Sequence, residues 1–451
     1  MKIFKFGGTS VKNASAMDKV FNVLNENGDE KKLVVLSACG GITNKITASV
    51  NIAANDDTYL EIIDQIEKHH FKLIDDLIKN NELQNEVKEK VSELITGLKT
   101  IHEGVSLLNE CTPKSLDHAL SYGELLSTTI FYYYLLENGV NAGFSDSRKI
   151  IKTDNNHNNA SVKHENFKQN INSILKPLFD KNDIIVIQGF IATDDKDQTT
   201  TLGRGGSDYT ASLYGAGLKE AGVDVDEIQI WTDVSGVLSG DPRKLLNTKT
   251  IPLMTFNEIR ELSFYGAKVL HPNTIKPAYE ANIPVRVMNT FVPLNPGTKI
   301  VDKIETKDYS LHSAVLKENC ILLRRNVPVK ENSHEILSKT LKELLVNKFN
   351  VLFSNSTESS ITIIIEEDTR FRDVEHTSSE KVSIICVSGT NITTDTQGKI
   401  LIDLADILAD KMPLKIVYGS SDVSILLTYK KAKAKKALKA IHGLITKKYL
   451  D

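Results

Sequence analysis

Residues 199–211, TTTLGRGGSDYTA, constrain this 451-residue chain more than any other stretch. An apolar run, residues 184–192, precedes them, and a segment with helical spacing, residues 209–218, follows. Glycine accepts positive φ and lets backbone N–H groups approach an anion closely. The N-terminus of a following helix adds partial positive charge. The stretch therefore predicts a site for a small zwitterion or a phosphate, and a glycine-rich surface turn is the alternative if it is taken alone.

Polar residues inside and outside this stretch indicate what the site would hold. The guanidinium of Arg204 can bind a carboxylate through two parallel hydrogen bonds, and Ser207 follows the glycines. Asp208 cannot bind the same anion, so we expect it to contact an amine, a lysine or a metal ion. Glu124 stands after a glycine near the start of a predicted helix, where it could equally favour the helix dipole.

Two earlier strands also end in glycine turns. Residues 2–6 predict a short strand that leads into Gly7 and Gly8, and residues 33–36 predict a second strand before another Gly-Gly turn. Two such strands, each followed by a helical pattern, indicate a parallel sheet with its ligand at the carboxyl ends. Lys5 can reach an anion there, although a plain turn with a solvated lysine fits the same residues.

A third group of polar residues suits a nucleotide. The predicted strand at residues 228–231 runs into Thr232 and Asp233, and Arg243 follows in an Asp-Pro-Arg sequence. These residues fit a base and ribose at the edge of a sheet, and a tight turn explains them equally well. Lys268 comes two residues after a glycine, from which it could reach a phosphate or simply face solvent.

Composition narrows the class of protein. The length predicts two or three domains, and the net charge of −3 favours neither nucleic acid nor an anionic membrane as a partner. The four cysteines form no CxxC motif, which indicates a reducing compartment and argues against a disulfide framework or a zinc site. Without an apolar leader or a run of about 18 apolar residues, we expect a cytoplasmic protein with no membrane contact.

The pattern changes near residue 310, where glycines become sparse and short strands alternate with helices. A βαββ order appears twice, and a final helix follows. This order predicts two small α+β modules with an antiparallel sheet. The lysine-rich run at residues 430–439 is interpreted as the polar face of the final helix, because Ala434, Leu438 and Ile441 keep helical spacing.

In combination, the motifs resemble the signatures of the aspartate kinases in the amino-acid kinase superfamily. The chain has no P-loop motif and no protein-kinase HRD/DFG pair, so phosphate handling requires another fold. The matching motifs, all within about residues 1–300, are KFGGTSV, LSACGGITN, SYGELLS, TTTLGRGGSDYTA, WTDVSGV, DPR, FYGAKVLHP and NPGT. The resemblance implies an α/β fold: a three-layer αβα kinase domain with a mainly parallel sheet over residues 1–300. Two ACT-like modules would follow at residues 310–375 and 376–451.

The resemblance also implies roles for individual residues. Lys5 and Asp208 would be catalytic, with Asp208 orienting Lys5. Arg204 would bind the α-carboxylate of L-aspartate and Glu124 its ammonium group. The full set that would hold L-aspartate is Thr43, Glu124, Arg204 and Ser207. The set that would hold ATP is Lys5, Gly7, Gly8, Thr232, Asp233, Arg243 and Lys268. No protein ligand for a metal is identified.

The implied reaction uses ATP and Mg²⁺ to convert L-aspartate into 4-phospho-L-aspartate and ADP. This is the first step towards lysine, threonine, methionine and isoleucine. Lysine or threonine would bind the ACT-like modules, although these modules could serve mainly for dimerisation, and a homodimer or larger homo-oligomer is expected. With no homoserine dehydrogenase domain after residue 451, we expect a monofunctional enzyme. The alternatives are a kinase for glutamate or N-acetylglutamate and a catalytically inactive amino-acid sensor.

Overall fold

The chain forms two compact units in the computed structural model. The model describes residues 1–28, 30–55, 58–267, 270–306, 308–368, 370–371, 374–409 and 411–450. The first unit comprises Met1–Val237 and Leu270–Asp302, and the second comprises Leu238–Val269 and Lys303–Asp451. Residues 238–269 therefore group with the carboxyl-terminal part of the chain. The boundaries expected from the sequence, at residues 300, 310 and 375, remain predictions.

A mainly parallel sheet forms the centre of the first unit, as the glycine turns predict. The strands, in spatial order, are β3 (Ala142–Ser145), β4 (Ile184–Gln188), β2 (Lys32–Leu36), β1 (Lys2–Phe6), β7 (Glu227–Thr232), β9 (Val285–Asn289) and β10 (Thr298–Val301). The neighbouring strands from β3 to β9 are parallel, and β9 and β10 are antiparallel. A separate hairpin joins β5 (Ile191–Thr193) to β6 (Thr199–Thr201).

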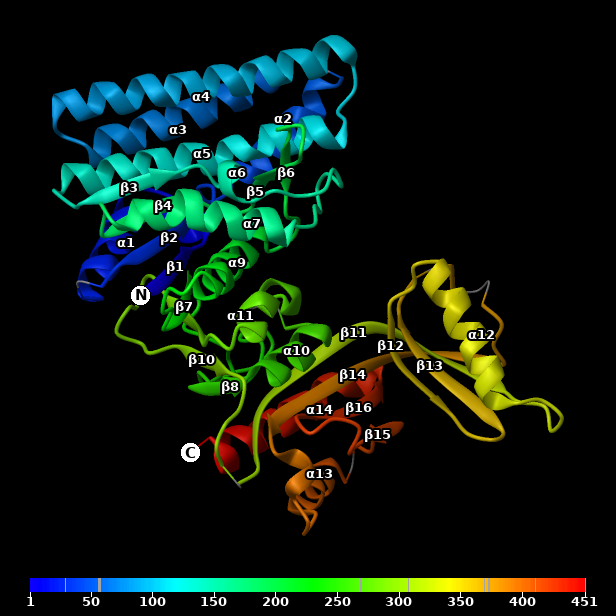
Figure 1. The fold of residues 1–451 in the computed structure, drawn as a ribbon. Coiled ribbons are helices and arrows are strands. Elements are labelled where there is room, and N and C mark those ends of the chain that lie inside the picture. The colour runs from blue at the N-terminus through cyan, green and yellow to red at the C-terminus, as the bar shows by residue number, and fades with distance from the viewer. Residues whose placement is uncertain are drawn as a thin grey trace. The chain divides into compact units, whose positions relative to one another are not determined.

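Helices cover both faces of this sheet, so the predicted three-layer αβα arrangement is confirmed (Figure 1). Alternate residues of a strand face opposite sides. Phe4 and Phe6 of β1 therefore pack into the core with α1 and α5, whereas Lys5 faces α9. The helices are α1 (Ala14–Glu26), α2 (Ile42–Ala53), α3 (Tyr59–Leu77), α4 (Asn81–Leu108), α5 (Pro113–Glu137), α6 (Ser147–Ile150), α7 (His164–Asn170), α8 (Lys176–Phe179), α9 (Gly206–Glu220) and α11 (Lys276–Glu280), with short turns η1 (Gly8–Val11), η2 (Ile171–Leu175) and η3 (Pro272–Thr274).

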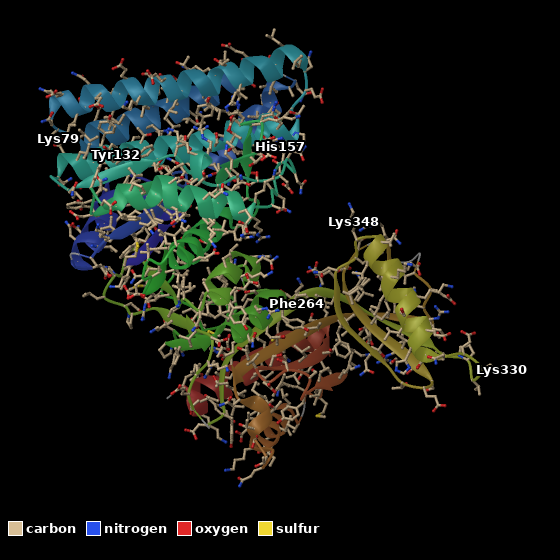
Figure 2. The ribbon with its side chains drawn as sticks, viewed as in Figure 1. Lys79, Tyr132, His157, Phe264, Lys330 and Lys348 are labelled. Carbon is tan, nitrogen blue, oxygen red and sulfur yellow. The ribbon has the colours of Figure 1, made fainter. Side chains whose placement is uncertain are left out.

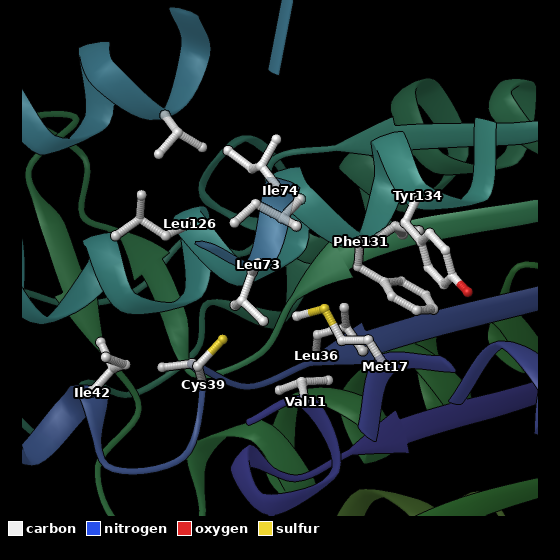
Figure 3. Packing of buried hydrophobic residues seen from close by; sticks show 14 of the residues in the cluster. Val11, Met17, Leu36, Cys39, Ile42, Leu73, Ile74, Leu126, Phe131 and Tyr134 are labelled. Atoms are coloured by element: carbon white, nitrogen blue, oxygen red, sulfur yellow. The ribbon is translucent and has the colours of Figure 1, made fainter. Parts of the chain in front are cut away.

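The charged segment between residues 56 and 110 forms the helical excursion that the sequence predicts. Its helices, α3 and α4, pack over α5 (Figure 1). Figure 3 shows how the layers meet, with Met17 of α1, Leu36 of β2 and Phe131 of α5 converging on one buried cluster. No helix within the described ranges is long and apolar enough to cross a membrane.

The second unit contains an antiparallel sheet, and the βαββ order occurs two times in it, as predicted. One long strand, β11, takes part in two separate cores: Leu311 and Ala314 lie in one, and Ile321 and Leu323 lie in the other. The sheet order is β12 (Val351–Ser356), β13 (Ser360–Glu366), β11 (Ser310–Asn326), β14 (Ser378–Thr390), β16 (Ser424–Lys430) and β15 (Lys415–Val417). The remaining elements are β8 (Leu253–Thr255), α10 (Phe256–Phe264), α12 (Ser333–Val346), η5 (Ile392–Thr394), α13 (Lys399–Leu408), α14 (Lys431–Leu444) and η6 (Ile445–Tyr449).

The turn between β2 and α2 packs so closely on η1 and α5 that each of these two elements needs a glycine at the contact. A Cβ at Gly8 would lie 2.9 Å from the carbonyl oxygen of Ala38, and a Cβ at Gly123 in α5 would lie 2.8 Å from the Ala38 Cβ. Backbone and Cβ atoms cannot rotate away as a long side chain can. The exits of β1 and β2 and the middle of α5 are therefore held in direct contact.

We predict that Gly123→Ala lowers the free energy of unfolding by about 1–3 kcal/mol, because the added methyl group overpacks this contact. Gly104→Ala in α4 is the matched control, since nothing lies within 4 Å of a Cβ there. That change should raise stability by about 0.5–1 kcal/mol through helix propensity. Urea unfolding followed by circular dichroism measures both values. Equal effects of the two substitutions would show that the contact is not tight.

Candidate active site

A cavity of about 350 Å³ opens at the carboxyl ends of β1 and β2. It brings together segments that are far apart in the sequence: two strand ends, the middle of α5 and the first turn of α9. Its predicted lining residues are Lys5, Gly8, Thr43, Glu124, Ser207 and Asp208, and it is further lined by Ser37, Ala38, Cys39, Gly40, Gly41, Asn44, Phe190, Gly203, Gly205 and Gly206. This is the edge of the sheet at which the parallel topology predicts a ligand.

A buried ion pair lies in the wall of this cavity. The Lys5 Nζ is 2.6 Å from the Asp208 Oδ1, and Lys5 is only 8% exposed. Lys5 points to the α9 side because of strand alternation, and Asp208 lies in the first turn of α9. An ammonium group has three donors, so this pairing leaves donors for an anion in the cavity. The geometry fits the expectation that Asp208 contacts a lysine.

Glu124 is a buried acid with one oxygen left unsatisfied. Its Oε1 accepts a hydrogen bond from the Ala38 N–H at 3.1 Å, and its Oε2 is buried without a hydrogen-bond partner among the described residues. Burial raises the pKa of Glu124 from about 4.5 to about 8, although the Ala38 N–H and the charge on Lys5 act in the opposite direction. A cation entering the cavity would favour the ionised carboxylate.

The helix-dipole explanation of Glu124 is wrong. The sequence places Glu124 near a helix start, but α5 begins at Pro113, about three turns earlier. Macrodipole effects fall off within the first turn. The real N-terminus of α5 is capped by Thr112, whose side chain accepts from the Ser115 N–H at 3.1 Å. The buried position of Glu124 therefore comes from its contact with the β2–α2 turn.

The glycine-rich stretch forms the turn into α9. Gly203 and Gly205 have φ of 73° and 72°, which glycine adopts without strain, and α9 begins at Gly206. Ser207 is buried beside the cavity. Arg204 is exposed and lines a second, larger hollow of about 880 Å³ instead of the cavity that holds Lys5. The structure thus gathers most of the predicted aspartate-binding side chains, but in this conformation it does not bring Arg204 among them.

The first glycine turn differs from the expected arrangement, in which a helix follows Gly7 and Gly8 and an anion binds at the turn. The Gly7 N–H is not free, because it donates to the Trp231 carbonyl at 3.0 Å. A short 3₁₀ turn, η1, follows Gly7, and α1 begins only at Ala14. The bond from Gly7 joins the exits of β1 and β7. Thr232, which follows Trp231, therefore lies beside the Lys5 end of the sheet.

The remaining nucleotide candidates are not gathered at this cavity. The Thr232 hydroxyl donates to the Asp233 carboxylate at 3.2 Å, on the exposed exit of β7. Arg243 belongs to the second unit, where its Nε and Nη2 both bind the carboxylate of Asp241 at 2.9 Å. Lys268 lies outside the described residues.

Phe190 is a cavity residue that the sequence does not reveal. It has a φ of 70°, which is uncommon for a bulky side chain, and its N–H donates to the Thr210 hydroxyl at 2.9 Å. A Cβ at Gly206 would lie 2.6 Å from the Phe190 ring. The sequence shows only an apolar residue at the end of an apolar run, so no signal distinguishes it from a core position.

Comparison with known families identifies the class of protein. The model of the amino acid kinase family matches residues 1–289. An aspartokinase 3 from Arabidopsis thaliana is 35% identical over 328 residues, which cover 71% of this chain and 56% of the relative. The chain thus spans little more than half the length of that relative. Lysine-sensitive aspartokinase 3 from Escherichia coli is 32% identical over 364 residues, which cover 81% of this chain and 78% of the relative.

Solved structures agree with the sequence comparison. The structure of Escherichia coli aspartokinase III in complex with aspartate and ADP superposes with a TM-score of 0.81 at 26% identity, covering 99% of this chain and 100% of the other. The aspartate kinase of Clostridium acetobutylicum has the same fold, with a TM-score of 0.80 at 23% identity. The chain belongs to the amino acid kinase family and, within it, to the aspartokinases.

We predict that the buried Glu124 makes stability depend on pH. Its pKa is about 8 in the folded protein and about 4.5 when exposed, so the folded state favours the neutral acid. This contribution is present below about pH 4.5 and is lost as the pH rises to about 8. Relative to Glu124→Gln, which does not titrate, wild-type protein should therefore lose on the order of a few kcal/mol across this range.

Urea unfolding of the two proteins at a series of pH values measures this difference. Glu124→Gln keeps an oxygen that can accept from Ala38, so the comparison isolates the titration. Parallel pH profiles for the two proteins would mean that folding does not raise the pKa of Glu124.

Proposed function

We propose that this protein transfers the γ-phosphoryl group of ATP to the side-chain carboxylate of L-aspartate, which yields 4-phospho-L-aspartate and ADP. The observation that carries the proposal is that one cavity holds both a buried cation, Lys5, and a buried acid, Glu124, with one oxygen that lacks a partner among the described residues. Lys5 suits phosphoryl oxygens, and the Oε2 of Glu124 suits a substrate ammonium group. The names of the relatives and the aspartate and ADP bound in the Escherichia coli structure support this assignment.

Recognition of aspartate would use the opposite charges of its ammonium group and its carboxylates. Glu124 would bind the ammonium group, and the hydroxyls of Thr43 and Ser207 would hold the carboxylates. Arg204 would bind the α-carboxylate after its side chain turns from its exposed position into the cavity. A bidentate arginine–carboxylate pair fixes orientation as well as adding affinity.

The reaction needs alignment more than acid–base chemistry. An aspartate side chain has a pKa of about 3.9, so it is already a nucleophile at neutral pH. The site must hold this carboxylate in line with the γ-phosphorus and stabilise charge on the phosphoryl oxygens. Lys5 would donate to those oxygens, and Asp208 would orient Lys5.

The nucleotide would lie along the exits of β1 and β7. Gly7, Gly8, Thr232 and Asp233 would contact it there. The resemblance to the aspartate kinases also assigns Arg243 and Lys268 to ATP. The hydroxyl and carboxylate oxygens of Thr232 and Asp233 are of the type that Mg²⁺ prefers, so these residues fit a nucleotide bound with magnesium. When bound, this ion neutralises charge on the phosphates.

Regulation and assembly are further parts of the proposal. Lysine or threonine would bind the ACT-like modules of the second unit. The name of the Escherichia coli relative and its structure with lysine and aspartate support lysine. Modules that serve mainly for dimerisation remain the alternative. A homodimer or larger homo-oligomer and a cytoplasmic location are also predicted.

We predict that hydroxylamine traps an acyl phosphate from ATP and L-aspartate, but not from ATP with glutamate or N-acetylglutamate. Lys5→Ala should lower kcat by on the order of 10²- to 10³-fold, because it removes a preorganised charge donor. This variant also controls for contaminating kinases. A colorimetric assay of the hydroxamate measures product formation with each substrate and with the Lys5→Ala variant. Equal product with glutamate, or full activity of Lys5→Ala, would contradict the proposed function.

A further inference from the structure

Asp117 is a buried acid on α5 that neither the sequence motifs nor the proposed reaction uses. Its side chain is fully buried, and three donors converge on its two carboxylate oxygens. Oδ1 accepts from the Thr201 hydroxyl at 2.5 Å. Oδ2 accepts from the Asn158 backbone N–H at 2.9 Å and lies 2.9 Å from the Nδ1 of His157. Figure 2 shows His157 near one end of the first unit's helical layer.

These contacts fix the loop at residues 154–161. Asp154 closes the loop, because its backbone N–H donates to the Ser161 carbonyl and its Oδ1 accepts from the Ser161 N–H, both at 2.9 Å. The Ala160 N–H then donates to the Thr201 carbonyl at 3.0 Å. Asp117 and Ala160 therefore bind the side chain and the backbone of the same residue in β6.

Thr201 stands two residues before the glycine-rich turn, and the loop also touches this turn directly. A Cβ at Gly203 would lie 2.7 Å from the Asn159 Oδ1 and 3.1 Å from the Asn158 carbonyl oxygen. The position of Gly203 is thus determined on one side by the loop and on the other by β6. Asp117 contacts both the loop and β6.

The same helix carries Glu124, seven residues after Asp117. Seven residues correspond to about 10 Å along a helix and to nearly two whole turns, so the two side chains leave α5 on the same side. Glu124 lines the cavity directly, whereas Asp117 acts through Thr201 and the loop. Helix α5 therefore supplies Glu124 to the cavity and also contacts, through Asp117, the segment that leads into the glycine-rich turn and α9.

We propose that Asp117 is a positioning residue that sets the distance between Glu124 and the glycine-rich turn, and thereby the affinity for the amino-acid substrate. The proposal rests on the proposed function for its kinetic consequence. Glu124 and the residues of the turn would bind different charged groups of one small substrate, so a shift of the turn weakens both contacts at once. The nucleotide residues at the exit of β7 do not depend on this support.

A carboxylate suits position 117 because it accepts at both oxygens, whereas an asparagine side chain has one acceptor and one NH₂ group. In Asp117→Asn, the NH₂ group would face either the Asn158 N–H, a buried donor that is costly to leave unpaired, or the Thr201 hydroxyl, which would then have to accept instead of donate. In both arrangements one of the hydrogen bonds that the carboxylate accepts is lost or reversed. The volume of the side chain hardly changes, so the substitution tests the hydrogen bonds rather than packing.

The test measures steady-state kinetics of Asp117→Asn and Thr201→Val. We expect the KM for aspartate to rise by about tenfold to a hundredfold, the range expected for lost hydrogen bonds to a charged acceptor. The KM for ATP and kcat should stay within about twofold of wild type. Thr201→Ser keeps the hydroxyl group and should restore the wild-type KM for aspartate.

Tyr133→Phe is the matched control on the same helix. It removes a buried hydroxyl that donates to Glu86, on the opposite side of α5 from the cavity. It should change stability but leave the KM for aspartate unchanged. Equal increases in the KM values for aspartate and ATP in Asp117→Asn, or a raised KM for aspartate in Tyr133→Phe, would overturn the proposal.

Hydrogen exchange provides a readout that does not need turnover. In Asp117→Asn, the amides of Asn158 and Ala160 should exchange faster than in wild type, whereas amides in α4 should not change. Unchanged exchange at these two amides would overturn the proposal. If wild-type protein formed no acyl phosphate from aspartate, the proposed function would fail, and the exchange rates would still decide whether Asp117 holds the turn.

Discussion

The close contact between the exits of β1 and β2 is the constraint on which the candidate active site depends. A Cβ at Gly8 would lie 2.9 Å from the Ala38 carbonyl oxygen, and one at Gly40 would lie 3.1 Å from the Gly8 carbonyl oxygen. Because these turns touch, the Ala38 N–H points at Glu124 and Lys5 is closed off from solvent. The main role of these glycines is thus to let the two turns touch, which brings the polar groups together. Leaving room for a ligand is their second role.

The electrostatics of the cavity are complementary to a zwitterion and a phosphate. Lys5 is paired with Asp208 but keeps donors for an anion, and Glu124 is held as a neutral acid by burial. A buried ionised carboxylate without a cation is unfavourable, so the free protein avoids one by keeping the proton. The substrate's ammonium group would supply the missing cation. The affinity for the substrate and the binding of a proton at Glu124 are therefore coupled.

The sequence predicts local features of this protein well and long-range polar contacts poorly. Glycine turns between short strands and helices predicted the parallel sheet with a ligand at its carboxyl ends, and the resemblance implied that Asp208 orients Lys5. Neither could predict that the Gly7 N–H bonds to Trp231, because that bond joins strands far apart in the chain. Likewise, Asp117 has no motif, since its partners lie 40 or more residues away. The helix-dipole explanation of Glu124 was wrong because α5 begins after its cap at Thr112, about three turns before Glu124.

Proton release on substrate binding tests most directly the claim that Glu124 is a neutral acid waiting for an ammonium group. Calorimetric titration with L-aspartate, in buffers of different ionisation enthalpy at about pH 7, gives the number of protons released. With a pKa of about 8 in the free protein, binding should release roughly one proton per site. Glu124→Gln should bind more weakly and release none. Aspartate binding to wild-type protein without proton release would contradict the account.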